Sequence, residues 1–199
     1  MTLIIPPGFG NAALVFNSTQ GTAPFVTTIG VDLSGYGGDF VLAANVVMLA
    51  FADAASTQVD GDLTLDRVTL SVGQDGPGGS VDSDTTPIPM TRSGNAGTYG
   101  MSIIARKVTN ELGRRGRGRM FIPGMVTQTE VDADGSVTST RRAQIETVLD
   151  DFYDNLADGF LTNPPLEPFL FHSSAPADPS PITGFVLSDL VGFLRGRIR

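Results

Sequence analysis

The sequence contains no cysteine and no tryptophan, and it has a single histidine and a single lysine. Without cysteine, the chain can form no disulfide, no thiolate zinc site and no thiol nucleophile. Aromatic residues make up 8% of the chain and none interrupts its arginine-rich segment, so the stacking platform of a sequence-specific nucleic-acid reader is missing. The longest apolar stretch, residues 40–52, is closed by Asp39 and Asp53 and is too short to span a bilayer.

The signature motifs of the common enzyme classes are also missing. The sequence has no GxSxG, HExxH or GxGxxG pattern, and Lys107 follows Arg106 rather than the glycine of a phosphate-binding loop. His172 lies beside Ser173 and near Asp178, which are the residue types of a hydrolase triad. Because this cluster falls on a predicted strand end and a proline-rich loop, a histidine in a structural contact is the better interpretation. We predict that the protein is not an enzyme and that it binds no cofactor.

One acidic segment imitates a calcium-binding loop. Residues 130–135 place acids at alternate positions before a glycine, as the first half of such a loop does. The twelfth position, which should be a bidentate acid, is Arg141, and its charge would repel the ion. Asp134 and Gly135 are better explained as a two-residue hairpin turn, since both tolerate positive φ. We therefore predict no metal site.

The beginning of the chain indicates an arm rather than a targeting signal. The segment MTLIIPPGFG has neither the basic n-region nor the apolar h-region of a signal peptide, so we expect a protein that is not secreted. Residues 1–11 are apolar and contain two prolines, and we expect an arm that folds onto its own domain or reaches a neighbouring subunit. Residues 12–199 have the length of a single domain, which we expect to be β-rich.

Glycine and proline indicate many turns. The 24 glycines and 13 prolines are spread along the chain as punctuation between short apolar segments. This pattern predicts an α+β fold that is mainly antiparallel β-sheet. The expected strands are residues 12–17, 25–33, 63–72, 85–91, 102–111, 119–129, 168–172 and 182–194. Of these, residues 102–111 and 119–129 are expected to be the arms of a hairpin with the arginine-glycine run at its tip.

Two helices are expected within this sheet protein. Residues 40–56 are apolar on almost every side, which predicts a helix buried in a core or in a subunit contact. Residues 141–158 form an amphipathic helix. The apolar stripe of this second helix consists of Ile145, Val148, Leu149, Phe152 and Leu156.

The ends of the second helix carry opposing signals. Thr140 can cap its beginning and Gly159 can end it. Arg141 and Arg142 lie in the first turn, where positive charge opposes the helix dipole. We therefore expect these two arginines to have partners elsewhere in the protein.

Charge is distributed unevenly along the chain. The formal net charge is −8. Residues 1–91 contain nine aspartates and one cation, Arg67, whereas residues 92–199 contain twelve acidic and twelve basic residues. The basic residues form two groups, namely Arg106, Lys107, Arg114, Arg115, Arg117 and Arg119, and then Arg195, Arg197 and Arg199.

The run GRRGRGR at residues 113–119 is the most distinctive local feature. Like charges this close repel by roughly 4 kcal/mol per pair at 4 Å and an effective dielectric of 20, so they need solvent or anions around them. Three interpretations remain open: a contact with an acidic surface of another subunit, a contact with nucleic-acid phosphates, and a solvated hairpin tip. The arginines at 195, 197 and 199 alternate with period two and would share one face of a strand.

Two segments carry a resemblance. SIIARKVTNELGRRGRGRMFIPG (residues 102–124) and the ending FLFHSS…ITGFVLSDLVGFLRGRIR are similar to small structural proteins encoded by bacterial viruses. The shared pattern is a strand, an arginine-glycine tip, an aromatic-x-Pro-Gly segment, a helix, a His-Ser strand and a basic terminus. The resemblance covers about the last hundred residues. It implies a homo-oligomeric component of a virion, made in the host cytoplasm.

The resemblance leaves the type of virion component open. A coat protein that assembles with itself is the first hypothesis, with the arginines at an interface or against the packaged genome. A tail or neck ring or tube subunit is the alternative, since head-to-tail packing of an acidic face on a basic one closes into rings. A nucleic-acid-binding module that clamps phosphates with the same arginines is the third. The expected contact residues are Arg114, Arg115, Arg117, Arg119, Arg195, Arg197 and Arg199.

Overall fold

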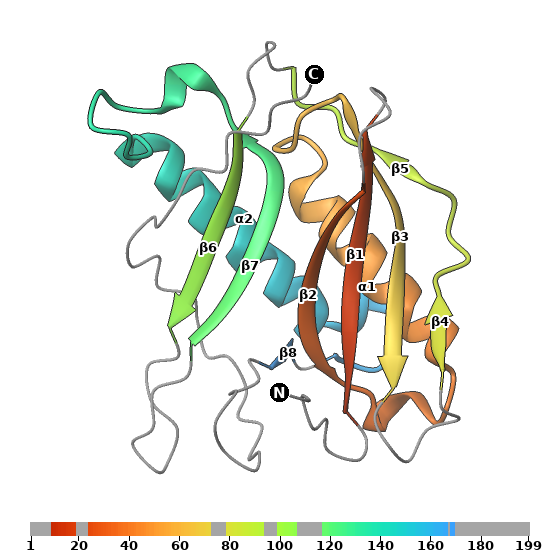
Figure 1. Cartoon of the computed structure of the whole chain (residues 1–199). Coiled ribbons are helices and arrows are strands. Elements are labelled where there is room, and N and C mark those ends of the chain that lie inside the picture. Colours follow the sequence, from red (N-terminus) through yellow and green to blue (C-terminus); the bar gives the residue numbers. More distant parts are fainter. Residues whose placement is uncertain are drawn as a thin grey trace.

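A computed structural model of the chain describes residues 9–18, 24–72, 79–93, 99–106, 117–166 and 168–169. A six-stranded sheet and a separate two-stranded hairpin lie on one side of the molecule, and two helices lie behind them (Figure 1). All the strand pairs are antiparallel. The predicted α+β fold with a mainly antiparallel sheet is therefore confirmed.

The large sheet has the strand order β4–β3–β1–β2–β8, and β5 also pairs with β3. Its centre is β1 (Phe9–Ser18), which lies between β2 (Phe25–Asp32) and β3 (Leu63–Val72). Residues 9–11, which the sequence assigns to an arm, are therefore part of the central strand. The short strands are β4 (Ser80–Asp82), β5 (Ile88–Pro89) and β8 (Pro168–Phe169).

The strand β3 changes its buried positions halfway along. Val68 and Leu70 are buried at even positions, whereas Leu63 and Leu65 are buried at odd positions. The pairing of β3 with β1 shifts at Asp66, which has no cross-strand partner in the register. Such a β-bulge turns the strand by one residue. It brings both halves of β3 onto the helix-covered side of the sheet, so that all four apolar side chains join the core.

Three phenylalanines connect the sheet to the two helices, α1 (Phe40–Ala55) and α2 (Ser139–Ala157). The ring of Phe51 on α1 lies 5.6 Å from that of Phe16 on β1 and 5.3 Å from that of Phe152 on α2, between ring centroids. Both contacts are edge-to-face, which is a favoured arrangement for aromatic pairs. Because all three rings are buried, this row fixes α1 between β1 and α2.

The buried helix α1 confirms the helix predicted at 40–56. It begins after Asp39, whose carboxylate accepts a hydrogen bond from the Leu42 amide at 3.0 Å and so caps the helix. Nine of its residues are buried, in agreement with its apolar composition.

The amphipathic helix α2 is also confirmed, but it begins earlier than predicted. Thr138, rather than Thr140, is the N-cap, and its hydroxyl accepts a hydrogen bond from the Arg141 amide at 3.4 Å. The reason is the antiparallel β-bridge between Val131 and Val137. Because Val137 is the last residue held in this extended pairing, the helix can begin directly after Thr138. Gly159 follows the helix with a φ of 60°, as expected for a residue that ends it.

The predicted arginine hairpin exists, with shifted arms. Strand β6 (Tyr99–Arg106) pairs with β7 (Arg117–Val126), whereas the predicted arms were residues 102–111 and 119–129. Arg117 and Arg119 are thus strand residues, not tip residues. The hairpin adjoins β2 in the fold. Its connecting residues, 107–116, lie outside the described part of the chain.

The turn predicted at Asp134-Gly135 is present but wider than predicted. Val131 and Val137 form an antiparallel bridge, and the loop is closed by a hydrogen bond of 2.8 Å from the Asp132 amide to the Ser136 carbonyl. Gly135 has a φ of 85°, whereas Asp134 keeps a negative φ, so only one of the two residues is left-handed. This geometry is a turn followed by a left-handed glycine, the next commonest hairpin connection after the two-residue loop.

The remaining predicted strands are short or lie outside the residues that the structure describes. The strand predicted at 85–91 is limited to β5, because Pro87 and Pro89 cannot donate hydrogen bonds to a ladder. The strand predicted at 168–172 is described only as β8. The strand predicted at 182–194 lies outside the described residues.

Candidate functional site: an arginine junction and an acidic helix face

The predicted contact residues lie largely beyond the described part of the chain. Arg114, Arg115 and the arginines at 195, 197 and 199 are outside it. The backbones of Arg117 and Arg119 are described on β7, opposite Arg106 and Ile104 of β6. This register therefore pairs two residues of like charge, Arg106 and Arg117, directly across the ladder.

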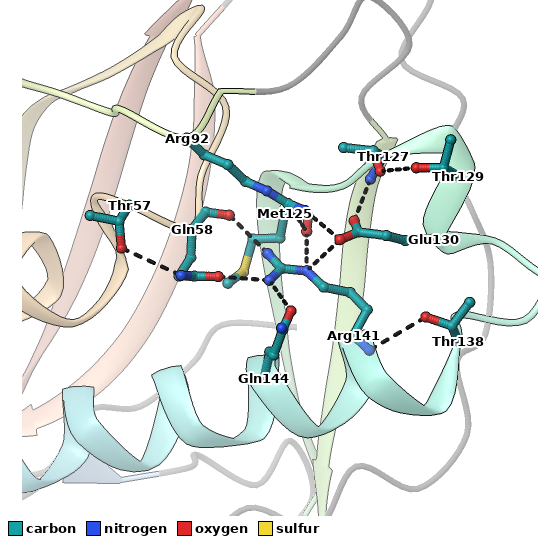
Figure 2. A network of polar contacts seen from close by, with 10 residues as sticks. All are labelled: Thr57, Gln58, Arg92, Met125, Thr127, Thr129, Glu130, Thr138, Arg141 and Gln144. Atoms are coloured by element: carbon teal, nitrogen blue, oxygen red, sulfur yellow. Dashed lines mark hydrogen bonds and ion pairs between the residues drawn. The ribbon is translucent and has the colours of Figure 1, made fainter.

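A second group of arginines, which the sequence did not single out as a site, is well described. Arg141 is the largest fully buried side chain, with 2% of its surface exposed. Its guanidinium donates to the Met125 carbonyl at 2.8 Å, to the Gln58 side chain at 2.7 Å and to the Gln58 carbonyl at 2.9 Å. It also donates to the Gln144 side chain at 2.9 Å (Figure 2). The expectation that Arg141 has partners outside the first turn is confirmed.

Arg92 and Glu130 complete this group. Arg92 donates to the same Met125 carbonyl at 2.6 Å and forms an ion pair with Glu130. The Glu130 carboxylate also lies 3.6 Å from the Arg141 guanidinium and accepts a hydrogen bond from the Thr127 amide at 2.8 Å (Figure 2). We call Gln58, Arg92, Met125, Glu130 and Arg141 the arginine junction.

The junction has asymmetric electrostatics, with two guanidiniums against one carboxylate. Burial acts to raise the pKa of Glu130, but the Thr127 hydrogen bond, the Arg92 hydrogen bond and both arginine charges outweigh it and lower the pKa. Burial, with the charge of Arg92, lowers the pKa of Arg141 to about 10, against the opposing effect of Glu130. Arg141 therefore stays charged at neutral pH and depends on its hydrogen bonds for compensation.

The junction joins segments that are far apart in the sequence. Gln58 follows α1, and Arg92 forms an isolated β-bridge with Asp60. Met125 is the residue before the last of β7, and Arg141 lies in the first turn of α2. The chain approaches closely here because Gly124, with a φ of 66°, leaves room where a Cβ would lie 2.9 Å from the Cβ of Asp60. The guanidinium donors of the arginine junction are directed at backbone carbonyls, side-chain amides and the Glu130 carboxylate. The arrangement is thus suited to holding the hairpin and α2 on the sheet, and it offers no reactive group.

The outer face of α2 carries the opposite charge. Glu146, Asp150, Asp154 and Asp158 follow one another at intervals of four residues, and Asp151 lies beside them. Burial, with the charges of Asp154 and Asp151, raises the pKa of Asp150. Among the described residues, no ion pair involves any of these five acids. We call these five residues the acidic face of α2.

This face opposes the dipole of its own helix. Negative charge is unfavourable at a helix C-terminus and positive charge is unfavourable at its N-terminus, and α2 has both. Arg141 is compensated by the junction, whereas the acids at the other end have no cationic partner within the described ranges. Part of this unfavourable arrangement is thus left uncompensated within the described part of the chain.

The structure gives little information on the remaining predictions, which concern His172, the segment that imitates a calcium loop, and metal binding. His172 lies outside the described residues. Glu130, the first acid of the segment that imitates a calcium loop, is held in the junction. Within the described ranges, no group of three or more potential ligands could hold a metal ion, and no helix there is long and apolar enough to cross a membrane.

Comparison with known proteins adds no relative. No protein-family model, no curated protein and no solved structure matches the chain.

Proposed function

We propose that this chain is a self-assembling structural subunit, and that its assembly is the coat of a virus or bacteriophage particle. The observation that carries the proposal is the separation of charge. Residues 1–91 contain nine aspartates and one arginine, and the acidic face of α2 adds five acids. The complementary cations belong to the arginine hairpin, which is Arg106, Lys107, Arg114, Arg115, Arg117 and Arg119.

The described arginines are already engaged or lie elsewhere. Arg67 pairs with Asp66 and Asp82, at 2.5 and 3.5 Å. Arg92 and Arg141 belong to the junction. Arg142 lies on α2, four residues before Glu146, but among the described residues it forms no ion pair with the acidic face. The arginine hairpin of a second copy supplies the positive charge that this face lacks.

This contact is head-to-tail, since a hairpin of one copy meets a helix of the next. Repeated head-to-tail contacts close into rings or shells when the rotation permits. The same contact would serve a tail or neck ring subunit, and the shape of the particle distinguishes the two. The arginine junction supports the proposal because it fixes the end of β7, and with it the hairpin, to the body.

A nucleic-acid-binding module is the second candidate, and one observation favours it. The register that places Arg106 opposite Arg117 calls for anions, and phosphates would serve as well as carboxylates. The two candidates differ in salt dependence. A protein that contacts about 6–10 phosphates loses roughly 10³–10⁵ in affinity between about 50 and 200 mM salt.

A charge swap tests the proposed contact. In the first variant, the arginines at 114, 115, 117 and 119 are replaced by glutamate. In the second, Glu146, Asp150 and Asp154 are replaced by lysine. Each variant alone should be monomeric, because the contacting surfaces then have the same sign. An equimolar mixture should assemble again, because each hairpin then meets a face of opposite charge.

The measurement is particle mass by light scattering, with negative-stain microscopy, for the wild type, both variants and the mixture. Closed particles of the wild type and recovery in the mixture are the expected results. Arg67→Glu is the matched control, since it removes an arginine remote from the hairpin, and it should still assemble. A wild type that stays monomeric at every concentration and salt would contradict self-assembly.

A further inference from the structure

The turn that follows α2 is strained. In the 3₁₀ segment Gly159–Leu161, Phe160 has a φ of 46° and Leu161 has a φ of 71°. They are the two non-glycine residues with positive φ in the described part of the chain. This left-handed conformation is unfavourable for side chains with a Cβ, and Asn or Gly would occupy it more readily.

The surrounding structure holds this turn in place. A Cβ on Gly159 would lie 2.8 Å from the backbone of Pro164, so the two segments are in close contact. The Tyr36 hydroxyl donates to the Pro164 carbonyl at 2.6 Å, and the Leu166 amide donates to the Leu156 carbonyl at 2.8 Å. The turn is therefore anchored to α2 and to the segment before α1, and its side chains are presented in fixed positions.

The two strained side chains have different surroundings. Phe160 is partly buried and packs against the hydrophobic core, so its burial compensates for the backbone strain. Leu161 is 84% exposed, more than any other large hydrophobic residue among those described. Among the residues that the structure describes, nothing gives Leu161 such compensation. Strain that the rest of the fold maintains is a mark of functional positions.

We propose that Leu161 is an apolar contact residue for a second copy of this chain. The proposal deepens the proposed function and rests on it. Charge complementarity identifies the occupant: Leu161 lies three residues after Asp158, the last acid of the face that meets the arginine hairpin of the next copy. The hairpin sequence combines its arginines with apolar residues, among them Ile103, Ile104 and Phe121. A leucine beside an acidic helix face matches such a basic and apolar partner.

Leu161→Asn separates a role in assembly from a role in the fold. Asparagine tolerates the left-handed conformation, so the variant should be at least as stable as the wild type, with a midpoint of thermal unfolding raised by up to about 2–4 °C. Loss of a buried leucine from the contact should raise the protein concentration needed for assembly by about tenfold or more. Leu161→Met keeps the apolar surface and should assemble as the wild type does.

The measurements are light scattering over a range of protein concentrations and thermal unfolding of the three proteins. A more stable Asn variant that assembles poorly, together with a Met variant that assembles normally, is the expected result. If the wild type and the Asn variant assemble at the same concentration, the role of Leu161 is refuted while self-assembly stands. If the wild type never assembles, the proposed function fails and this contact fails with it.

Discussion

At the scale of single residues, two neighbouring arginines differ in their surroundings. Arg141 makes hydrogen bonds with Met125, Gln58 and Gln144 and is 2% exposed. The Nε of Arg142 is also buried, yet it has no hydrogen-bond partner. The sequence treats the pair alike, as two cations that oppose the dipole of α2. Their positions around the helix decide that only Arg141 enters the junction.

This difference predicts that replacement by methionine will destabilise the protein at Arg141 but hardly at Arg142. Arg141→Met should lower the free energy of unfolding by about 3–5 kcal/mol, because it breaks a buried network: the Gln58 carbonyl loses the arginine that donates to it, and Glu130 keeps only one of its two arginines. Arg142→Met should change it by no more than about 0.5 kcal/mol, because no hydrogen bond of its Nε is lost. Urea unfolding of the two variants measures both values. Equal losses would contradict the structural role of the junction.

At the scale of secondary-structure elements, α2 shows a conflict between local and global preferences. Its apolar stripe fixes it in the core through Phe152 and its neighbours. Its charges are arranged against its dipole at both ends. The first turn is compensated within the chain. The charge of the acidic face is compensated only in the proposed contact. The isolated subunit should therefore be less stable than a variant in which these acids do not oppose the dipole of α2.

Asp154→Lys tests this conflict. The substitution creates opposite-charge pairs with Asp150 and Asp158 at intervals of four residues and adds a cation near the helix C-terminus. The free energy of unfolding of the monomer should rise by about 0.5–1 kcal/mol in low salt, and about 1 M salt should remove most of that gain. Assembly should become weaker. A variant that gains stability and also assembles better would contradict the proposed role of this face.

At the scale of the whole molecule, the junction couples the hairpin and α2 to the sheet through one carboxylate. Because the pKa of folded Glu130 lies below its ordinary value of 4.5, the charged form is favoured by folding. The stability that Glu130 contributes is present above pH 4.5. It is lost as the pH falls through the lower value of the folded state, where two guanidiniums remain without an anion.

Glu130→Gln should therefore change the pH dependence of the whole protein. At pH 7 the variant should be less stable by about 1–3 kcal/mol, since the hydrogen bonds of a charged carboxylate are lost. The difference from the wild type should shrink as the pH falls below 4.5, because the wild type then loses the same charge. Denaturant unfolding between pH 7 and pH 3 measures both effects, and Glu146→Gln on α2 is the control. A difference that is constant with pH would refute the role of the Glu130 charge.

The sequence by itself determined the features that depend on neighbouring residues. The apolar composition of residues 40–56 placed α1, and the apolar periodicity of residues 141–158 placed α2. Short apolar segments between turn residues placed β1, β2 and β3, and the arginine-glycine run marked the connection of β6 to β7. The charge separation between the hairpin and the rest of the chain was also visible, since it requires only counting. The same local signals identified Arg141 as a residue in need of partners.

Only the tertiary structure decided what those partners are. Met125 carries no signal of its role, because it contributes a backbone carbonyl that any position could offer. Gln58 contributes its backbone carbonyl and its side-chain amide oxygen, and no sequence pattern marks it as a partner of Arg141. In the sequence, Glu130 resembles the first acid of an ion-binding loop. In the fold, β7 lies against the loop after α1, and Glu130 is held between Arg92 and Arg141. The turn that contains Leu161 likewise lies against a distant segment, because Gly159 packs on Pro164 and the Pro164 carbonyl accepts a hydrogen bond from Tyr36. These features depend on segments that are distant along the chain, and no local pattern encodes which segments meet.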